Sequence, residues 1–181
     1  MGKFLLKDVE DKPLPFLEHL EELRRRLIYS IVVITIFSII ANRFVPLILN
    51  SLVKSTGKLV FINPTEAFLV NIKLTLFLGI YLSLPFLFYQ IWGFVGRGLK
   101  KEEKKIVLPL SFISFILFNI GIFFCYFFIL PLGIKFLFSY SLGIIEPMIS
   151  VNNYLSFIVG MIFSFGLIFE LPLLILFFSI Y

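Results

Sequence analysis

The sequence has few charged residues and little cysteine for a chain of 181 residues. Charged residues make up 15% of it, whereas soluble domains average about 25%. Its one cysteine, Cys125, excludes an internal disulfide and any metal cluster that needs several cysteines from one chain. Its one histidine, His19, has no cysteine near it in the sequence and does not indicate a metal site. We therefore expect no metal and no cofactor.

Catalytic motifs are absent as well. The sequence contains no HExxH zinc motif, no serine in a nucleophile elbow and no glycine-rich phosphate loop. An intramembrane hydrolase would need a nucleophile beside a base, and no such pair can be named here. These absences argue against an enzyme.

Long apolar runs dominate the sequence instead. Hydrophobic residues make up 60% of it, including 25 phenylalanines. A helix needs about 20 apolar residues to cross a bilayer, and we place four such spans at about 27–44, 67–94, 105–132 and 153–178. The sequence therefore predicts an all-α polytopic membrane protein with a single transmembrane domain over residues 1–181. Because the chain stops inside an apolar run without a polar flank, we expect it to be truncated at its C-terminus.

The distribution of basic residues predicts the orientation. Of the 16 lysines and arginines, eleven fall in the N-terminal segment and in the loop between the second and third spans. Short loops rich in these residues are retained in the cytoplasm, so we expect the N-terminus and this loop on the cytoplasmic side of the inner membrane. This placement explains the net charge of +5 by topology and anionic lipid, without nucleic acid.

The two connections on the other side predict an outer cap. Residues 45–66 are mixed in character and are expected to contain one short helix. A second piece should follow where Pro131 and Gly133 break the third span. Asn63 is expected to cap the second span, and Asn152 or Asn153 the fourth.

Lys73 lies about two turns into the second span. There its stem can lie along apolar surface while its ammonium reaches water or Glu66. Pro85, further along the same span, is expected to kink the helix.

Glu170 is the strongest single indication of function. An unpaired acid costs on the order of 3 kcal/mol at the membrane centre. Glu170 could pair with a residue beyond this chain or lie near an interface, but we favour a polar contact for another helix. The alternative is a secondary transporter or channel that uses Glu170 as a proton or ion site, with Pro85 and Pro172 breaking helices beside it.

Several acids near the cytoplasmic surface allow two interpretations. Glu102 and Glu103 can pair with adjacent lysines, or one of them can accept a guanidinium from a partner. Glu21 and Glu22 present the same alternatives, since Arg25 and Arg26 follow four residues later. Phe94, beside Trp92, would be an aromatic belt residue in the commoner case.

Several segments of the sequence together resemble the TatC family, the multispanning receptor subunit of the Sec-independent twin-arginine protein translocase. They occur in the family's order and cover nearly the whole chain. The matching stretches are FLEHLEELRRRL (16–27), PTEAF (64–68), IKL (72–74), Pro85 with YQIWGF (89–94), GLKKEE (98–103) and FGLIFELP (165–172). One departure is Arg97, which stands where the family usually has a loop proline.

The resemblance implies a fold and a function. The family has six spans in a curved, concave helical wall with an extracytoplasmic cap, and this chain looks like the first four. The implied function is a receptor for the twin-arginine signal peptides of folded cargo and a core assembly platform of the translocase. Glu22, Arg24, Phe94 and Glu103 fall on signal-peptide positions, and Glu170 on the position that contacts a partner helix.

The resemblance also implies partners. These are TatB-like and TatA-like single-span subunits, signal peptides and membrane lipid, and we expect a homo-oligomer within a larger complex.

Overall fold

The fold consists almost entirely of long helices. The computed structural model describes residues 16–56, 59–96, 103–139 and 149–180. Its α-helices are α1 (Phe16–Ala41), α2 (Val45–Thr56), α3 (Pro64–Val95), α4 (Val107–Phe124), α5 (Leu130–Ser139) and α6 (Val151–Ile180). Short helical turns connect some of them, at η1 (Asn42–Phe44), η3 (Glu103–Ile106) and the π-helical η4 (Cys125–Ile129).

Four stretches of the described residues are long and apolar enough to cross a membrane. They run over His19–Ser51, Pro64–Val95, Val107–Leu137 and Val151–Ser179. The predicted all-α, polytopic membrane fold is therefore confirmed. The helices extend beyond the predicted spans, and the share of each that lies in lipid stays a prediction.

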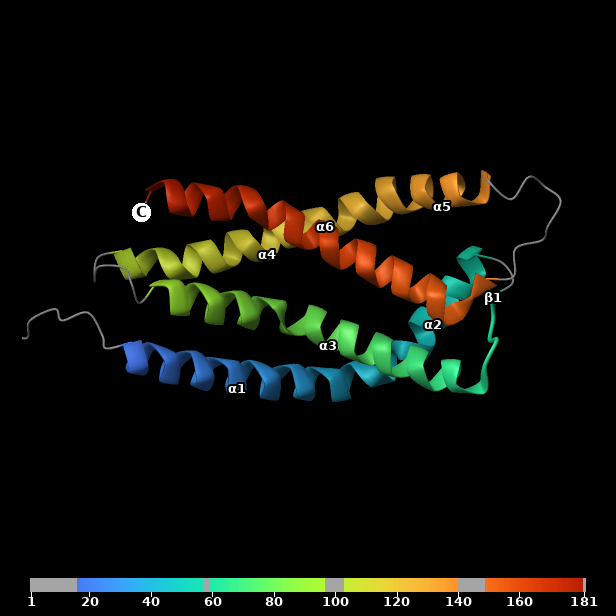
Figure 1. Ribbon diagram of the computed structural model, residues 1–181, viewed down its shortest axis with the longest axis horizontal. Helices are drawn as coiled ribbons and strands as arrows, with labels where there is room; N and C mark the ends of the chain where they lie inside the picture. The colour runs from blue at the N-terminus through green and yellow to red at the C-terminus, as the bar shows by residue number, and fades with distance from the viewer. Residues whose placement is uncertain (1–15, 57–58, 97–102, 140–148, 181) are drawn as a thin grey trace, which may run out of the picture.

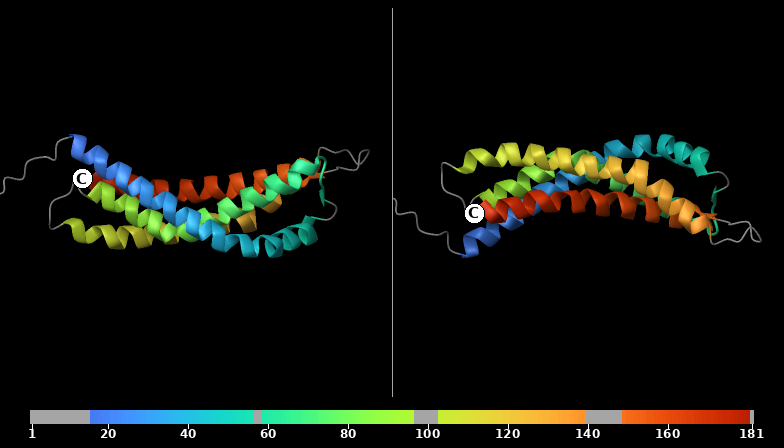
Figure 2. Two further views of the ribbon diagram at one scale, coloured as in Figure 1. Left: turned by 90° about the horizontal axis from the view of Figure 1, so that it is seen from below. Right: turned by 90° about the horizontal axis from the view of Figure 1, so that it is seen from above.

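The long helices form a curved wall. α1 packs against α3, α3 against α4, and α6 against both α4 and α3. Figure 2 shows that the wall is bowed along its length. One end of it holds the start of α1, the end of α3, the start of α4 and the end of α6. We call it the basic end, because Arg24, Arg25 and Arg26 lie on α1 there.

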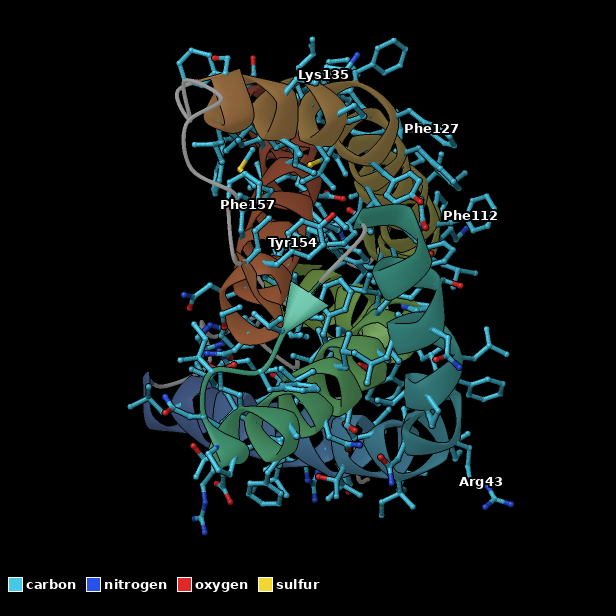
Figure 3. All side chains as sticks on the ribbon, turned by 90° about the vertical axis from the view of Figure 1, so that its right-hand side faces the viewer. Arg43, Phe112, Phe127, Lys135, Tyr154 and Phe157 are labelled. Carbon is cyan, nitrogen blue, oxygen red and sulfur yellow. The ribbon has the colours of Figure 1, made fainter. Side chains whose placement is uncertain are left out.

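The opposite end carries α2, α5 and a short parallel strand pair, and we call it the capped end. β1 (Leu59–Val60) pairs with β2 (Ile149–Ser150) in the register Leu59 to Ile149. The predicted short helix between residues 45 and 66 is present as α2. Figure 3 looks onto this end, where Arg43 and Lys135 point outward.

Glu66 joins α3 to the strand pair. Its carboxylate is buried and accepts hydrogen bonds from the Ile62 N–H and the Ser150 hydroxyl, both at 3.1 Å. The two pieces of the cap, 84 residues apart in sequence, are thereby held together.

The starts of α3 and α6 differ from the predicted caps. Asn63 precedes α3 and Pro64 takes its first position as expected, but the Asn63 side chain makes no capping hydrogen bond. α6 begins at Val151, two residues earlier than predicted, and the hydroxyl of Ser150 accepts the Asn153 N–H at 3.4 Å. Ser150 therefore takes the capping role predicted for Asn152 or Asn153, because its short hydroxyl already faces the helix start.

The predicted break at Pro131 and Gly133 is wrong, since α5 runs through both residues to Ser139. The turn before Pro131 is π-helical instead of α-helical. Proline lacks an N–H for the ordinary helical bond, and a π turn changes the bonding pattern so that the helix can continue. The predicted disruption is confined to that turn.

Of the two partners predicted for Lys73, water and Glu66, the second is wrong. Its ammonium donates to the side-chain oxygen of Asn152 at 2.7 Å and to the Ser156 hydroxyl at 2.8 Å. These two residues are one turn apart on α6 and face α3. Glu66 meanwhile bonds to the strand pair, so it does not pair with Lys73.

Aromatic and aliphatic side chains fill the space between the helices in three clusters. The largest, near the basic end, joins α3, α4 and α6 through residues that include Phe88, Trp92 and Phe118. A second lies at the capped end, and a third surrounds Cys125, which is fully buried and packs among the apolar side chains of this cluster. Tyr154 and Phe157 of α6 pack against this third cluster (Figure 3).

Candidate functional site

The first candidate site lies at the basic end, where α1 meets α3. Glu22 is 7% exposed and accepts a hydrogen bond from the Arg26 Nε at 2.6 Å. This is the i,i+4 pair that the sequence predicted between acid and base. Because the carboxylate is buried, the ion pair is screened far less than a pair on an exposed surface.

Arg26 also connects the two helices. Its Nη1 donates to the Gln90 backbone oxygen at 3.2 Å and to the Gln90 side-chain oxygen at 2.8 Å. Sequence reasoning did not single out Gln90, although an amide near the end of an apolar run was a usable signal. The guanidinium lies directly against Gly93, where an added Cβ would come within 2.7 Å of Nη1.

An aromatic contact completes this corner. The His19 and Phe94 rings stack with their centroids 4.3 Å apart and an interplanar angle of 23°. His19, Glu22 and Arg26 occur at i, i+3 and i+7 on α1, so they share the helix face that meets α3. The structure thus brings Phe94 and Glu22, two of the predicted site residues, to one corner.

The other two predicted residues stand apart from this contact. Arg24 is exposed, and it lies roughly 200° around α1 from Glu22, on a different face. The backbone of Glu103 begins η3, but its side chain lies outside the described part of the structure, as do residues 97–102. The role predicted for Glu103 therefore stays a prediction.

The second candidate site surrounds Glu170 between α3, α4 and α6. The indole N–H of Trp92 donates to the Ser114 hydroxyl at 2.8 Å, and Ser114 is hydrogen-bonded to the Glu170 side chain. Glu170 is 6% exposed, and its Oε1 has no hydrogen-bond partner among the described residues. Ser114 is fully buried, and no pattern in the sequence distinguished it from other serines in apolar runs.

The two sites share one segment of α3. Gln90 and Phe94 are four residues apart and face α1, whereas Trp92 lies between them in sequence and faces α4 and α6. The last turns of α3 therefore carry side chains of both sites. Within the part of the chain that the structure describes, no three acidic, histidine or cysteine side chains gather as a metal site would require.

Comparisons with known proteins give one consistent result. The family model "Sec-independent protein translocase protein (TatC)" matches residues 18–181. A protein of that name from Carboxydothermus hydrogenoformans is 42% identical over 171 residues, which cover 92% of this chain and 70% of the relative. Another, from Desulforapulum autotrophicum, is 37% identical over 93% of this chain and 65% of the relative.

A solved structure agrees with these relatives. The crystal structure described as the twin arginine translocase receptor TatC superposes with a TM-score of 0.78 at 36% identity. The match covers 86% of this chain and 72% of that chain. The chain thus spans about two thirds of the length of the proteins that it matches.

Proposed function

Because the chain belongs to the TatC family of Sec-independent protein translocases, we propose that it receives twin-arginine signal peptides at the corner formed by α1 and α3. The family's role is that of a receptor in protein translocation, and the chain is a membrane component of that translocase. We propose that it binds its cargo without catalysing a reaction.

The observation that carries this proposal is the corner around Glu22. A peptide arginine needs a carboxylate that accepts its guanidinium, and a charge-assisted hydrogen bond contributes about 1.5 to 3 kcal/mol. Glu22 supplies such a carboxylate, and the stacked rings of His19 and Phe94 offer an aromatic surface three residues away on α1. Aromatic faces attract guanidinium groups.

Two arginines require a second acid. Glu103, at the start of η3, is the residue that we assign to the second guanidinium, and Arg24 is the exposed neighbour on the α1 side of the site. In this arrangement the basic end faces the cytoplasm of a bacterial-type inner membrane. The lysines of the loop and the adjoining turn, such as Lys105, would hold it against anionic lipid.

For the second site we propose a contact with a single-span partner helix. An acid in an apolar span is functional as a rule, and the free Oε1 of Glu170 is suited to a polar side chain from such a helix. TatB-like and TatA-like subunits are the proposed partners, and the chain would act as an assembly platform in a homo-oligomer within the larger complex.

The receptor role is tested by crosslinking. A signal peptide with a photoreactive residue beside its arginine pair is expected to crosslink to the wild-type chain, but not to the Glu103→Ala or Glu103→Lys variant. Glu102→Ala is the matched control, because it removes the adjacent acid of the same loop and should leave crosslinking intact. Normal crosslinking in both Glu103 variants would remove the loop from the site.

The orientation needs a separate measurement. The Lys105→Cys variant, in a chain that also carries Cys125→Ala, should react with a membrane-impermeant maleimide only when the cytoplasmic side is accessible. Labelling from the outer side alone would invert the topology and end the receptor proposal.

A further inference from the structure

The carboxylate of Glu22 already holds an arginine of its own chain. Only 6% of the Glu22 side chain and 19% of the Arg26 side chain are exposed, and the two groups meet at 2.6 Å. The buried acid at the corner is therefore occupied before any peptide arrives. A peptide arginine that binds there has to take the place of a chemically identical group.

We propose that Arg26 is a resident guanidinium that competes with the signal peptide for Glu22 and so sets the affinity threshold of the receptor. The inference rests on the proposed function and concerns the regulation of the same site. It assigns to Arg26 an effect that is separate from holding α1 and α3 together.

The hydrogen bonds of Arg26 make such a replacement possible. Nε donates to Glu22, whereas Nη1 donates to the backbone and side-chain oxygens of Gln90. The Gln90 contacts do not depend on Glu22, so Arg26 keeps a place on α3 when the carboxylate changes partner. Gly93 provides the room for this place, since the guanidinium lies against bare backbone there.

The preference of the Glu22 carboxylate for a guanidinium decides which peptide can take the place of Arg26. Replacing one guanidinium by another keeps the charge-assisted hydrogen bonds of the carboxylate. A lysine is a strongly hydrated point charge that cannot match the planar fork of a guanidinium, so the exchange is unfavourable for it. Arg26 lowers the affinity of the Glu22 site for every cation by the same factor. The cation that binds more weakly is then no longer bound at the concentration available.

Glu22 without the Arg26 guanidinium would have the opposite property. A buried carboxylate that loses a charged hydrogen-bond partner is destabilised and accepts another cation more readily. Removing the resident should therefore tighten peptide binding, whereas removing a purely structural residue should weaken it.

The experiment measures the dissociation constant of fluorescent signal peptides for the full-length chain in nanodiscs, by anisotropy. One peptide carries the arginine pair and a second carries two lysines in its place. Arg26→Gln removes the resident, and Arg26→Lys leaves a weaker resident with unchanged net charge. Arg25→Gln is the matched control, because it removes the same charge from an exposed neighbour.

Arg26→Gln is expected to bind both peptides on the order of tenfold more tightly than Arg25→Gln does. Arg26→Lys should show a smaller gain in the same direction, and it serves as the decisive variant if Arg26→Gln does not fold. The ratio of the two affinities should stay constant across the variants, as competition requires.

Weaker binding of both peptides in the two Arg26 variants would overturn the inference and make Arg26 a structural residue. Affinities equal to those of Arg25→Gln would overturn it as well, since charge alone would then account for them. If the wild-type chain and Arg25→Gln bind the arginine peptide no better than the lysine peptide, the receptor proposal itself fails, and the role of Arg26 with it. If the wild type discriminates but the Arg26 variants show no gain, only the competition is refuted.

Discussion

The indole N–H of Trp92 donates to the hydroxyl of Ser114 at 2.8 Å in the interior of the wall. Because Ser114 also bonds to Glu170, one hydroxyl links α3, α4 and α6. The Trp92 ring packs edge-on against Phe177 of α6, with the centroids 5.1 Å apart. Polar and aromatic contacts thus fix the position of the acid proposed to meet a partner.

Ser114→Ala should destabilise the fold by about 1 kcal/mol, because Trp92 and Glu170 lose a partner in a buried place. The sequence contains one tryptophan, so fluorescence excited selectively at tryptophan, and not at the seven tyrosines, reports on the surroundings of Trp92. We expect a lower unfolding midpoint in detergent and a shifted emission maximum. Ser164→Ala, at an exposed serine of α6, should change neither, and an unchanged emission maximum in Ser114→Ala would contradict the link.

Glu170→Ala should weaken association with a single-span partner, measured by copurification from the membrane. Glu170→Gln keeps the size of the side chain and an oxygen for Ser114, so it should retain most of the partner. Equal recovery with the alanine variant and the wild type would show that the partner binds elsewhere.

The cap allows a double-mutant cycle between Glu66 and Ser150. Each single alanine variant should lower the unfolding free energy, since the Glu66 carboxylate also accepts the Ile62 N–H and the Ser150 hydroxyl also accepts the Asn153 N–H. The double variant should lose less than the sum by about 0.5 to 1.5 kcal/mol, which is the coupling of their shared hydrogen bond. Strictly additive losses would mean that the 3.1 Å contact contributes nothing to holding the cap.

The helical fold could be predicted from the sequence, because long apolar runs and clustered lysines are strong, local signals. The third predicted span, which forms α4, η4 and α5, shows the limit of such reasoning. Pro131 predicts a break, but whether the helix ends or continues through a π turn depends on packing, and here Cys125 and Leu130 are buried against Ile158 and Ile162 of α6. Sequence alone does not contain that packing.

The candidate site was predictable in part, for a related reason. The Glu22–Arg26 pair lies within one helix, so the i,i+4 spacing predicted it. The partners of Arg26 and Lys73 lie on other helices, at Gln90 on α3 and at Asn152 and Ser156 on α6. Spacing along the chain carries no information about which helix faces meet, and the wrong expectation for Lys73 follows from that.

The backbones of α4 and α6 approach each other closely at Gly121. A Cβ added there would lie 2.7 Å from the carbonyl oxygen of Phe165 and 3.1 Å from the Cα of Gly166, both backbone atoms of α6. Small residues at such crossings let membrane helices pack tightly, which is the main source of attraction between them in lipid.

Gly121→Ala should therefore force α4 and α6 apart and destabilise the fold by about 1 to 3 kcal/mol, despite the better helix propensity of alanine. Gly160→Ala is the matched control, because no atom lies within 4 Å of its added Cβ. It should leave the stability unchanged or raise it by up to about 1 kcal/mol. The readout is the unfolding midpoint of both variants in the same detergent, and equal midpoints would show that the α4–α6 crossing has room for a methyl group. Because Glu170 lies one turn beyond Gly166 on α6, the Gly121 variant should also lower recovery of the single-span partner, while the Gly160 variant should not.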